Sequence, residues 1–280
     1  DTVGVDCVAM NVNDLVCVGA RPLALVDYIA VEESNPDRLH DIAIGLKTGA
    51  EQAGIEVPGG ELAQVPELIK GHPSPYGFDL CATAIGTVEL DRIVSGDGIV
   101  PGDALIGVPS SGLHSNGLTL ARTVLLEGAS PDDRPEGLGG ESIADVLLEP
   151  TVIYVRAALE LLESGIPVSG LFHITGGGLL NLLRLGKDVG YRIEQPLAAT
   201  PVFGEIQRRA DIGAAEMYEV FNMGCGFAVT VPEAHADEVV ALFSARHPGT
   251  ARIGSVTDKA GRVEVPSLGI AGDAAGLRDD

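Results

Sequence analysis

The sequence predicts a two-domain protein of mixed α and β structure, with an α+β or α/β architecture in which helices pack on sheets. Short apolar runs typical of strands alternate with segments of helical spacing in both halves of the chain. Hydrophobic residues make up 45% of the 280 residues, which is enough apolar material for packed cores. Because single cores stop growing beyond roughly 250 residues, we expect two domains.

The first half of the chain contains a predicted strand, a predicted helix and two further strands. The apolar run Leu23 to Ala30 predicts a buried strand. Asn35 followed by Pro36 is an N-cap with a first-turn proline, and apolar residues repeat at helical spacing from there to Gly54. The remaining elements are strands at 55–57 and 80–88, with a long loop at 59–77 between them.

The second half begins where turn residues concentrate, between 95 and 103. We place a domain boundary near residue 96, which predicts domains at 1–95 and 96–280. The expected helices are 118–126, 151–163 and 234–246, and the expected strands are 104–108, 226–231, 251–256 and 262–265. From Ser267 on, Gly, Ala and Asp dominate with little periodicity, so we expect a loose tail.

Composition excludes several classes of partner. The chain carries 18 basic and 40 acidic residues, a formal net charge of −22 at pH 7, and has no run of Lys and Arg that would attract nucleic acid or anionic lipid. Its longest apolar stretch, 15–30, is interrupted by charges and a proline, and its start has no signal-peptide pattern. The four cysteines form no Cys-x-x-Cys pair, which favours reduced thiols. We therefore expect a cytoplasmic protein with no nucleic-acid or membrane partner.

Two clusters in the first half have the chemistry of a metal site. Asn13 and Asp14 are polar residues inside an otherwise apolar, helix-like stretch. Asp14 is a candidate Mg²⁺ ligand with Asn13 beside it, and a cap or a buried hydrogen bond is the structural alternative. Gly59, Gly60 and Glu61 follow a strand, so the glycines would allow close approach of a ligand and Glu61 would complete a hard-metal site, while a plain turn explains them equally well.

The run 109–117 lies between a predicted strand and a predicted helix and is rich in small polar residues. Ser111, His114 and Asn116 are its candidate binding residues. Backbone amides at a helix N-terminus bind anions, and His114 could position or protonate a reacting group. This density of small polar residues favours function over a plain turn.

A second glycine-rich run leads into the apolar segment 179–185. Thr175, Gly176, Gly177 and Gly178 at a helix entrance fit a phosphate cradle, although a lone glycine run is weakly specific. No Gly-Lys-Ser/Thr follows, so this run is not a Walker A loop, and it lacks the spacing of a dinucleotide fingerprint.

Several of these motifs, taken in chain order, carry a resemblance to a known family. They are Val-Asn-Asp-Leu at 12–15, Gly-Ala-Arg-Pro at 19–22, Gly-Gly-Glu at 59–61, Ser-Ser-Gly-Leu-His-Ser-Asn-Gly at 110–117, Pro-Thr-Val-Ile-Tyr-Val at 150–155, His-Ile-Thr-Gly-Gly-Gly at 173–178, Glu-Met-Tyr at 216–218 and Phe-Asn-Met-Gly-Cys-Gly-Phe at 221–227. With them the chain resembles the phosphoribosylformylglycinamidine cyclo-ligase family, also called aminoimidazole ribonucleotide synthetases, of purine biosynthesis.

The resemblance implies a PurM-like fold of two domains. The N-terminal domains of a homodimer pair to form a β-barrel, and a C-terminal α/β domain closes each active site. It also implies the reaction, in which ATP with Mg²⁺ activates the formyl amide oxygen of formylglycinamidine ribonucleotide as a phosphate ester. A nitrogen of the same substrate then attacks that carbon, and phosphate leaves as the imidazole ring of aminoimidazole ribonucleotide closes.

By position, the resemblance assigns the Mg-ATP role to Asp14 and Glu61 and places His114 with its neighbours at the active site. Gly176 to Gly178 take the phosphate-loop role. The family carries a further motif upstream of Asp1 that contributes to metal and nucleotide binding, and this chain departs from the family pattern at Leu62, Gln64 and Asn181.

Two alternatives remain open at this point. Related ATP-dependent phosphotransferases share the architecture, but several have an Asp where this chain has His173, which favours the cyclo-ligase. The other alternative is a noncatalytic, truncated nucleotide-binding or dimerisation module.

Overall fold

The computed structural model describes residues 1–279, and these divide into two compact units. Unit 1 contains Asp1–Arg92 together with Ile153–Arg156, and unit 2 contains Ile93–Val152 and the described residues from Ala157 on. Both units combine helices with a sheet, so the predicted mixed α and β fold class is confirmed. The boundary near residue 96 stays a prediction, and nothing in the sequence pattern indicates that Ile153–Arg156 groups with unit 1.

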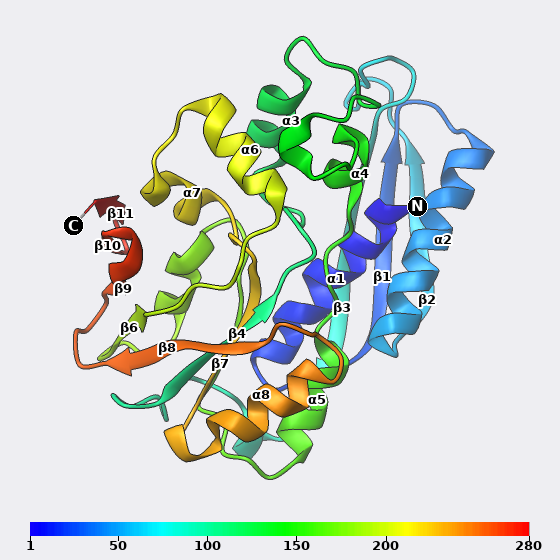
Figure 1. Ribbon diagram of the computed structural model, residues 1–280. Coiled ribbons are helices and arrows are strands. Elements are labelled where there is room, and N and C mark those ends of the chain that lie inside the picture. Colours follow the sequence, from blue (N-terminus) through cyan, green and yellow to red (C-terminus); the bar gives the residue numbers. More distant parts are fainter. Residues whose placement is uncertain (280) are drawn as a thin grey trace. The chain divides into compact units, whose positions relative to one another are not determined.

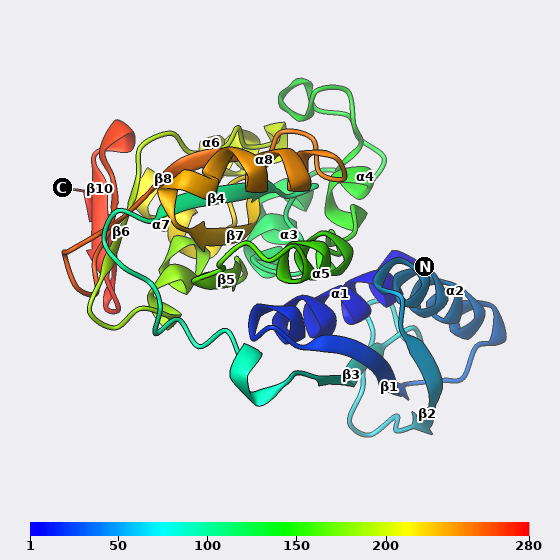
Figure 2. The same ribbon diagram turned by 90° about the horizontal axis from the view of Figure 1, so that it is seen from below.

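Unit 1 is a three-stranded sheet with two helices on one face (Figures 1 and 2). The sheet has the order β2-β1-β3, with β1 parallel to β2 and antiparallel to β3. Its elements are α1 (Thr2–Cys17), β1 (Arg21–Val31), α2 (Pro36–Ala53), β2 (Glu56–Gln64) and β3 (Phe78–Thr87). Val5, Val8, Val12 and Val16 of α1 recur at helical spacing and are buried, as is Leu25 of β1.

The local sequence accounts for α2 at both ends. Asn35 Oδ1 accepts a hydrogen bond from the Arg38 backbone amide at 3.1 Å, and Pro36 occupies the first turn. Gly54 ends the helix in the left-handed region, with φ at 73°. The predicted helix is therefore confirmed.

The predicted loop at 59–77 is wrong in its first part. Residues 59–64 continue β2, because they pair with β1 through backbone hydrogen bonds. The glycines in this run do not reveal that pairing. The shorter loop that remains is held by Glu32, a buried carboxylate that accepts hydrogen bonds from the Gly71 amide at 2.7 Å, the Ser74 hydroxyl at 2.5 Å and the Gly77 amide at 3.3 Å. These hydrogen bonds to Ser74, Gly71 and Gly77 lower the pKa of Glu32 to about 2.

Unit 2 is built on an eight-stranded sheet of order β11-β10-β9-β6-β8-β4-β7-β5. All neighbouring strands are antiparallel except β6 and β9. Its strands are β4 (Ala104–Pro109), β5 (Gly170–His173), β6 (Gly190–Ile193), β7 (Cys225–Val231), β8 (Ala251–Thr257), β9 (Val263–Val265), β10 (Ile270–Asp273) and β11 (Gly276–Asp279). Its helices are α3 (Leu118–Leu126), α4 (Ile143–Leu148), α5 (Val155–Glu163, whose first two residues group with unit 1), α6 (Pro201–Ala210), α7 (Ala214–Val220) and α8 (Ala236–Ser244).

Both faces of this sheet are covered (Figure 2). On one face, Leu105 of β4 belongs to a core that also contains Phe203 of α6 and Met217 of α7. On the other face, Phe227 of β7 stacks on Phe243 of α8 with ring centroids 6.4 Å apart. Central strands β4 and β7 are consequently buried on both sides and consist of apolar residues almost throughout.

Two further expectations for unit 2 are wrong. The helix expected at 151–163 begins only at Val155, because residues 150–152 make hydrogen bonds to another loop. Instead of a loose tail, the residues after Ser267 form a hairpin of β10 and β11. Composition does not reveal this pairing between two parts of the tail.

Close packing of α1 on α2 generates a testable contrast between two helical glycines. A Cβ on Gly49 would lie 2.9 Å from the Cβ of Val8, whereas a Cβ on the exposed Gly204 of α6 would meet nothing within 4 Å. We predict that Gly49→Ala lowers the free energy of unfolding by about 1–2 kcal/mol through overpacking. Gly204→Ala should raise it by up to about 1 kcal/mol through helix propensity. Urea unfolding of both variants measures this, and equal effects of the two substitutions would contradict it.

Candidate functional site

Asn13 and Asp14 of α1 have different surroundings within unit 1. Asn13 is fully buried, and its Oδ1 accepts a hydrogen bond from the Tyr154 backbone amide at 2.9 Å. This is the buried hydrogen bond that the sequence left as the structural alternative for this pair. Asn13 thereby fixes the short segment Ile153–Arg156 that unit 1 takes from the middle of the chain.

Asp14 is exposed and lines a groove of about 420 Å³ between α1 and β3. The groove is lined by Met10, Asn11, Asp14, Leu15, Val18, Ala82, Thr83 and Ala84. Only Asp14 contributes a charged group to this lining. A carboxylate beside small strand residues leaves room for a ligand of Asp14.

Gly59, Gly60 and Glu61 lie inside β2, so the plain turn that the sequence left as the structural alternative for these residues is wrong. Gly60 pairs with Asp27 of β1, and a Cβ on Gly60 would lie 2.5 Å from Asp27 Oδ1. Gly60 is therefore required for the Asp27 side chain to lie across the sheet. Glu61 pairs with Tyr28, so it points to the opposite face from Asp27.

Asp27 is a candidate residue that the sequence analysis missed. Its partner on β3 is Ala82, which also lines the groove beside Asp14. Burial raises the pKa of the Asp27 carboxyl above its ordinary value. The sequence did contain a signal for this residue, namely an aspartate inside the apolar run 23–30. A charge on a half-buried strand needs a partner or a ligand.

The described residues contain no group of three or more His, Cys, Asp or Glu side chains arranged to hold a metal ion. The acids that could contribute to a Mg²⁺ site are Asp14 and Asp27 on the helix-covered face of the sheet and Glu61 on the open face. One or two carboxylates are enough for Mg²⁺ when nucleotide phosphates supply further oxygens. The donors in unit 1 therefore fit a metal that arrives with a nucleotide.

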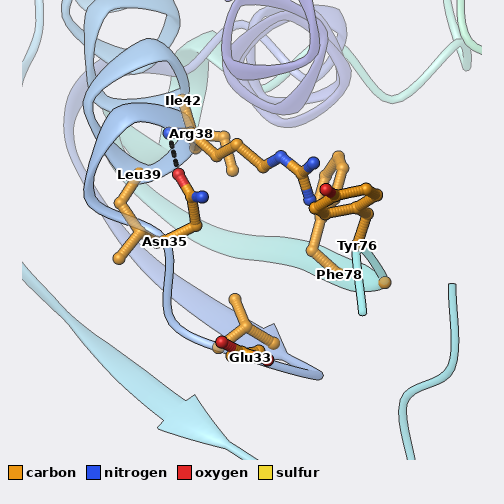
Figure 3. A pocket seen from close by; sticks show the side chains of 9 residues that line it. Glu33, Asn35, Arg38, Leu39, Ile42, Tyr76 and Phe78 are labelled. Carbon is orange, nitrogen blue, oxygen red and sulfur yellow. Dashed lines mark hydrogen bonds between the residues drawn. The ribbon is translucent and has the colours of Figure 1, made fainter. Parts of the chain in front are cut away.

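A second hollow in unit 1 is too small for a nucleotide (Figure 3). It has a volume of about 10 Å³, roughly that of a single water site. The Arg38 guanidinium lies over the Tyr76 ring, 3.5 Å from its centroid, and closes one side. We interpret this hollow as a packing junction between the start of α2 and the loop before β3.

In unit 2, His114 lies at the centre of the loop between β4 and α3. It is 4% exposed and adopts a φ of 58°. Its Nε2 accepts hydrogen bonds from the backbone amides of Ser111 at 3.2 Å and Val152 at 3.5 Å. Burial, together with the nearby His173, lowers the pKa of His114 to about 3, so the imidazole is neutral at pH 7.

Two hydroxyl contacts join the same loop to residues 150–152. The Ser111 hydroxyl donates to the Pro150 carbonyl at 2.7 Å, and the Ser115 and Thr151 hydroxyls are 2.9 Å apart. With the His114 contact to Val152, these bonds fix residues 110–116 against a segment without regular secondary structure. Ser111 and His114, both predicted from the sequence, are thus brought together by the structure.

The glycine-rich run is shaped by Asn181, whose role the sequence left open. Asn181 is 4% exposed, and its Oδ1 accepts from the Thr175 backbone amide at 2.6 Å and lies 3.3 Å from the Thr175 hydroxyl. The segment that follows is the 3-10 helix Gly178–Arg184, so the helix that this glycine run enters is short and is not an α-helix. Gly178 has a φ of 50°, where glycine avoids the strain that a Cβ would add.

The two loops of unit 2 touch each other. A Cβ on Gly176 would lie 2.8 Å from Asn116 Oδ1, so Gly176 lets the loops approach closely. The backbone amides of Gly176 and Gly177 make no hydrogen bond within residues 1–279. Consecutive amides without partners, in a partly exposed glycine turn, form a concavity suited to an anion.

Comparison with known proteins identifies two family matches. The N-terminal domain of AIR synthase related proteins matches residues 1–88, and the C-terminal domain of the same proteins matches residues 100–266. The phosphoribosylformylglycinamidine cyclo-ligase of Methanothermobacter thermautotrophicus is 48% identical over 268 residues, which cover 95% of this chain and 76% of that protein. The enzyme of the same name from Thermococcus kodakarensis is 48% identical over 272 residues, covering 96% and 76%.

Solved structures show the same fold at lower identity. A hydrogenase maturation protein HypE in complex with ATP has a TM-score of 0.70 at 22% identity and covers 99% of this chain and 78% of its own. A thiamine-monophosphate kinase from Stenotrophomonas maltophilia has a TM-score of 0.68 at 22% identity, covering 94% and 78%. The predicted two-domain fold is therefore confirmed.

The buried, neutral His114 generates a prediction about acid stability. Its pKa is lowered in the folded protein, so the unfolded chain binds this proton more readily, and its contribution to stability is lost as the pH falls from about 6.5 to about 3. We predict that His114→Gln, which offers an acceptor near the Nε2 position but does not titrate, unfolds less steeply with pH over this window. Urea unfolding between pH 7 and pH 5 measures the slope. Parallel pH dependence in the variant and the unmodified protein would count against a neutral His114.

Proposed function

Because the chain belongs to the family of AIR synthase related proteins, we propose that it closes the imidazole ring of aminoimidazole ribonucleotide. The reaction is the ATP-dependent cyclisation of formylglycinamidine ribonucleotide, which gives ADP and phosphate as a step of purine biosynthesis. The observation that carries the proposal is 48% identity over nearly the whole chain to relatives named phosphoribosylformylglycinamidine cyclo-ligase. This chain spans about three quarters of their length.

The reaction uses the phosphate groups of ATP, so the site must bind anions. Unit 2 has a turn that is suited to binding them. ATP supplies the phosphoryl group that turns the formyl amide oxygen into a leaving group. We propose that the backbone amides of Gly176 and Gly177 bind phosphate oxygens, with Thr175 and Gly178 shaping the turn. Ser111 and Asn116, on the touching loop, complete the binding residues of this unit.

His114 serves this reaction as a positioning group. The sequence left open whether it positions or protonates a reacting group, and burial with a low pKa favours positioning. Its Nε2 accepts from backbone amides of both 111 and 152, so the neutral imidazole holds the loop in place. We therefore assign no proton-transfer step to His114.

Mg²⁺ accompanies ATP in this proposal and neutralises its phosphate charge. Asp14 and Glu61 are its proposed ligands, with Asn13 holding α1 and Gly59 and Gly60 allowing close backbone approach. Asp14 lies on α1, which packs on one face of the sheet, and the register puts Glu61 on the opposite face. The two carboxylates therefore contribute separately and do not share one ion within a protomer.

We also propose a homodimer that forms through the open face of the unit 1 sheet. The face carries exposed hydrophobic side chains, which in water favour burial against a partner. Val26 and Tyr28 are 42% and 40% exposed, and Ile85 is 59% exposed. The register places these residues on the face opposite the helices.

The protein is proposed to act in the cytoplasm on small-molecule substrates. All four cysteines are free thiols, as is usual in a reducing compartment. No helix within residues 1–279 is long and apolar enough to cross a membrane.

The direct test is formation of aminoimidazole ribonucleotide by the purified chain with formylglycinamidine ribonucleotide, ATP and Mg²⁺. We predict turnover, and we predict that Asp14→Asn raises the Mg²⁺ concentration for half-maximal rate by about tenfold. The matched control is Asp41→Asn on the exposed side of α2, which should leave that concentration unchanged.

Phosphorylation of another substrate without ring closure would instead support a related phosphotransferase. ATP binding with no turnover of any substrate would support a noncatalytic module.

The dimer prediction is tested by sedimentation. We predict that the unmodified chain sediments as a dimer and that Ile85→Lys sediments as a monomer, because a lysine at the centre of an apolar interface would be desolvated. Leu90→Lys, at a site 88% exposed and outside the sheet, should leave the dimer intact. A monomeric unmodified protein, or equal effects of both lysines, would refute an interface on this face.

A further inference from the structure

Asn222 is a buried amide in the run Phe-Asn-Met-Gly-Cys-Gly-Phe at 221–227, to whose members the sequence assigns no individual roles. It lies in the turn between α7 and β7 and is 4% exposed. The turn around it is tight, since Met223 and Gly224 both have positive φ, at 48° and 90°. A buried carboxamide in such a turn must satisfy two donors and an acceptor oxygen.

All four hydrogen-bonding positions of the Asn222 carboxamide are used within unit 2. Nδ2 donates to the carbonyls of Gly112 at 2.9 Å and Leu113 at 3.2 Å. Oδ1 accepts from the Ser110 hydroxyl at 2.8 Å and from the Gly224 amide at 2.9 Å. Three of these partners lie in the loop between β4 and α3, about 110 residues away along the chain.

One backbone bond and one packing contact reinforce this junction. The Ser110 amide donates to the Gly224 carbonyl at 3.0 Å. The Phe221 ring lies against Gly117, where a Cβ would come within 2.6 Å of its Cδ1. The Asn222 turn therefore holds both ends of the loop that carries Ser111, His114 and Asn116.

Asn222 is poorly suited to bind a ligand itself. Its two protons and both acceptor sites are taken by protein groups, and its side chain is almost completely covered. A ligand could reach it only by replacing one of these bonds.

We infer that Asn222 is a positioning residue that fixes the conformation of residues 110–113 and thereby sets the binding geometry of the loop. Its effect on turnover rests on the proposed function, whereas its effect on the loop does not. Because a misplacement of about 1 Å in a site can cost about 100-fold in rate, loss of this junction should lower kcat/KM by about that factor.

Replacing Asn222 with aspartate separates the effect of its hydrogen bonds from the effect of its shape. Asn222→Asp keeps the size of the side chain and the oxygen that accepts hydrogen bonds from Ser110 and Gly224. It replaces the donating Nδ2 with a second oxygen, which then faces the carbonyls of Gly112 and Leu113. Burial and those carbonyls raise the pKa of the new carboxyl. Once protonated, the carboxyl can donate to one carbonyl again, so activity relative to the unmodified protein should recover as the pH falls from 8 to 6.

The experiment combines hydrogen exchange with kinetics on the purified full chain. Asn222→Ala and Asn222→Asp are compared with Ser169→Ala, a control that removes side-chain hydrogen bonds to Asp103 and the Thr230 carbonyl before the start of β5. We expect exchange at the Ser111 amide to accelerate by about tenfold or more in both Asn222 variants and to remain unchanged in Ser169→Ala. We also expect kcat/KM to fall only in the Asn222 variants, with the pH recovery confined to Asn222→Asp.

Unchanged exchange at Ser111 in a folded Asn222→Asp protein would overturn the inference, as would equal kinetic losses in all three variants. If Asn222→Ala does not fold, the pH recovery of Asn222→Asp decides the question. If the unmodified chain makes no aminoimidazole ribonucleotide, the proposed function fails, and the exchange measurements still decide whether Asn222 fixes the loop.

Discussion

A loop without regular structure can be buried only if its backbone amides and carbonyls find hydrogen-bond partners, and the site in unit 2 depends on this constraint. Three buried side chains provide those partners. Asn222 bonds the carbonyls of Gly112 and Leu113, His114 accepts the amides of Ser111 and Val152, and Asn181 accepts the amide of Thr175. A side chain without a matching donor or acceptor at these positions would leave buried polar groups without partners.

This arrangement leaves a small set of groups available for chemistry. With the loops held from within, the amides of Gly176 and Gly177 remain open at the surface of the turn. Groups fixed before a ligand arrives need not be ordered when it binds, which favours tight binding of a transition state with changing phosphate charge. Unit 1 is organised differently, since its acids lie on a regular helix and sheet and their spacing follows from register.

The parts that sequence predicted well are those determined locally. The ends of α2 follow from Asn35, Pro36 and Gly54, each acting on its own neighbours. The parts that failed depend on distant partners. Gly59 and Gly60 were expected at the start of a long loop, but pairing with β1 makes them part of a strand. Residues 151–154 have helical periodicity, yet they have no regular structure and make hydrogen bonds to Ser115 and Asn13 instead of continuing the helix. The site loops could be located from their motifs, whereas the function of Asn222 depends on atoms some 110 residues away and has no local pattern.

Amide hydrogen exchange in the protein without ligand tests whether buried side chains hold the loops before a ligand binds. If buried side chains hold the loops in advance, the amides of Ser111 and Thr175, bonded to His114 and Asn181, exchange slowly before any nucleotide is added. The amides of Gly176 and Gly177 exchange rapidly until phosphate groups bind. Rapid exchange at Ser111 and Thr175 in the free protein, slowing only on nucleotide binding, would contradict the account, because the loops would then be ordered by the ligand.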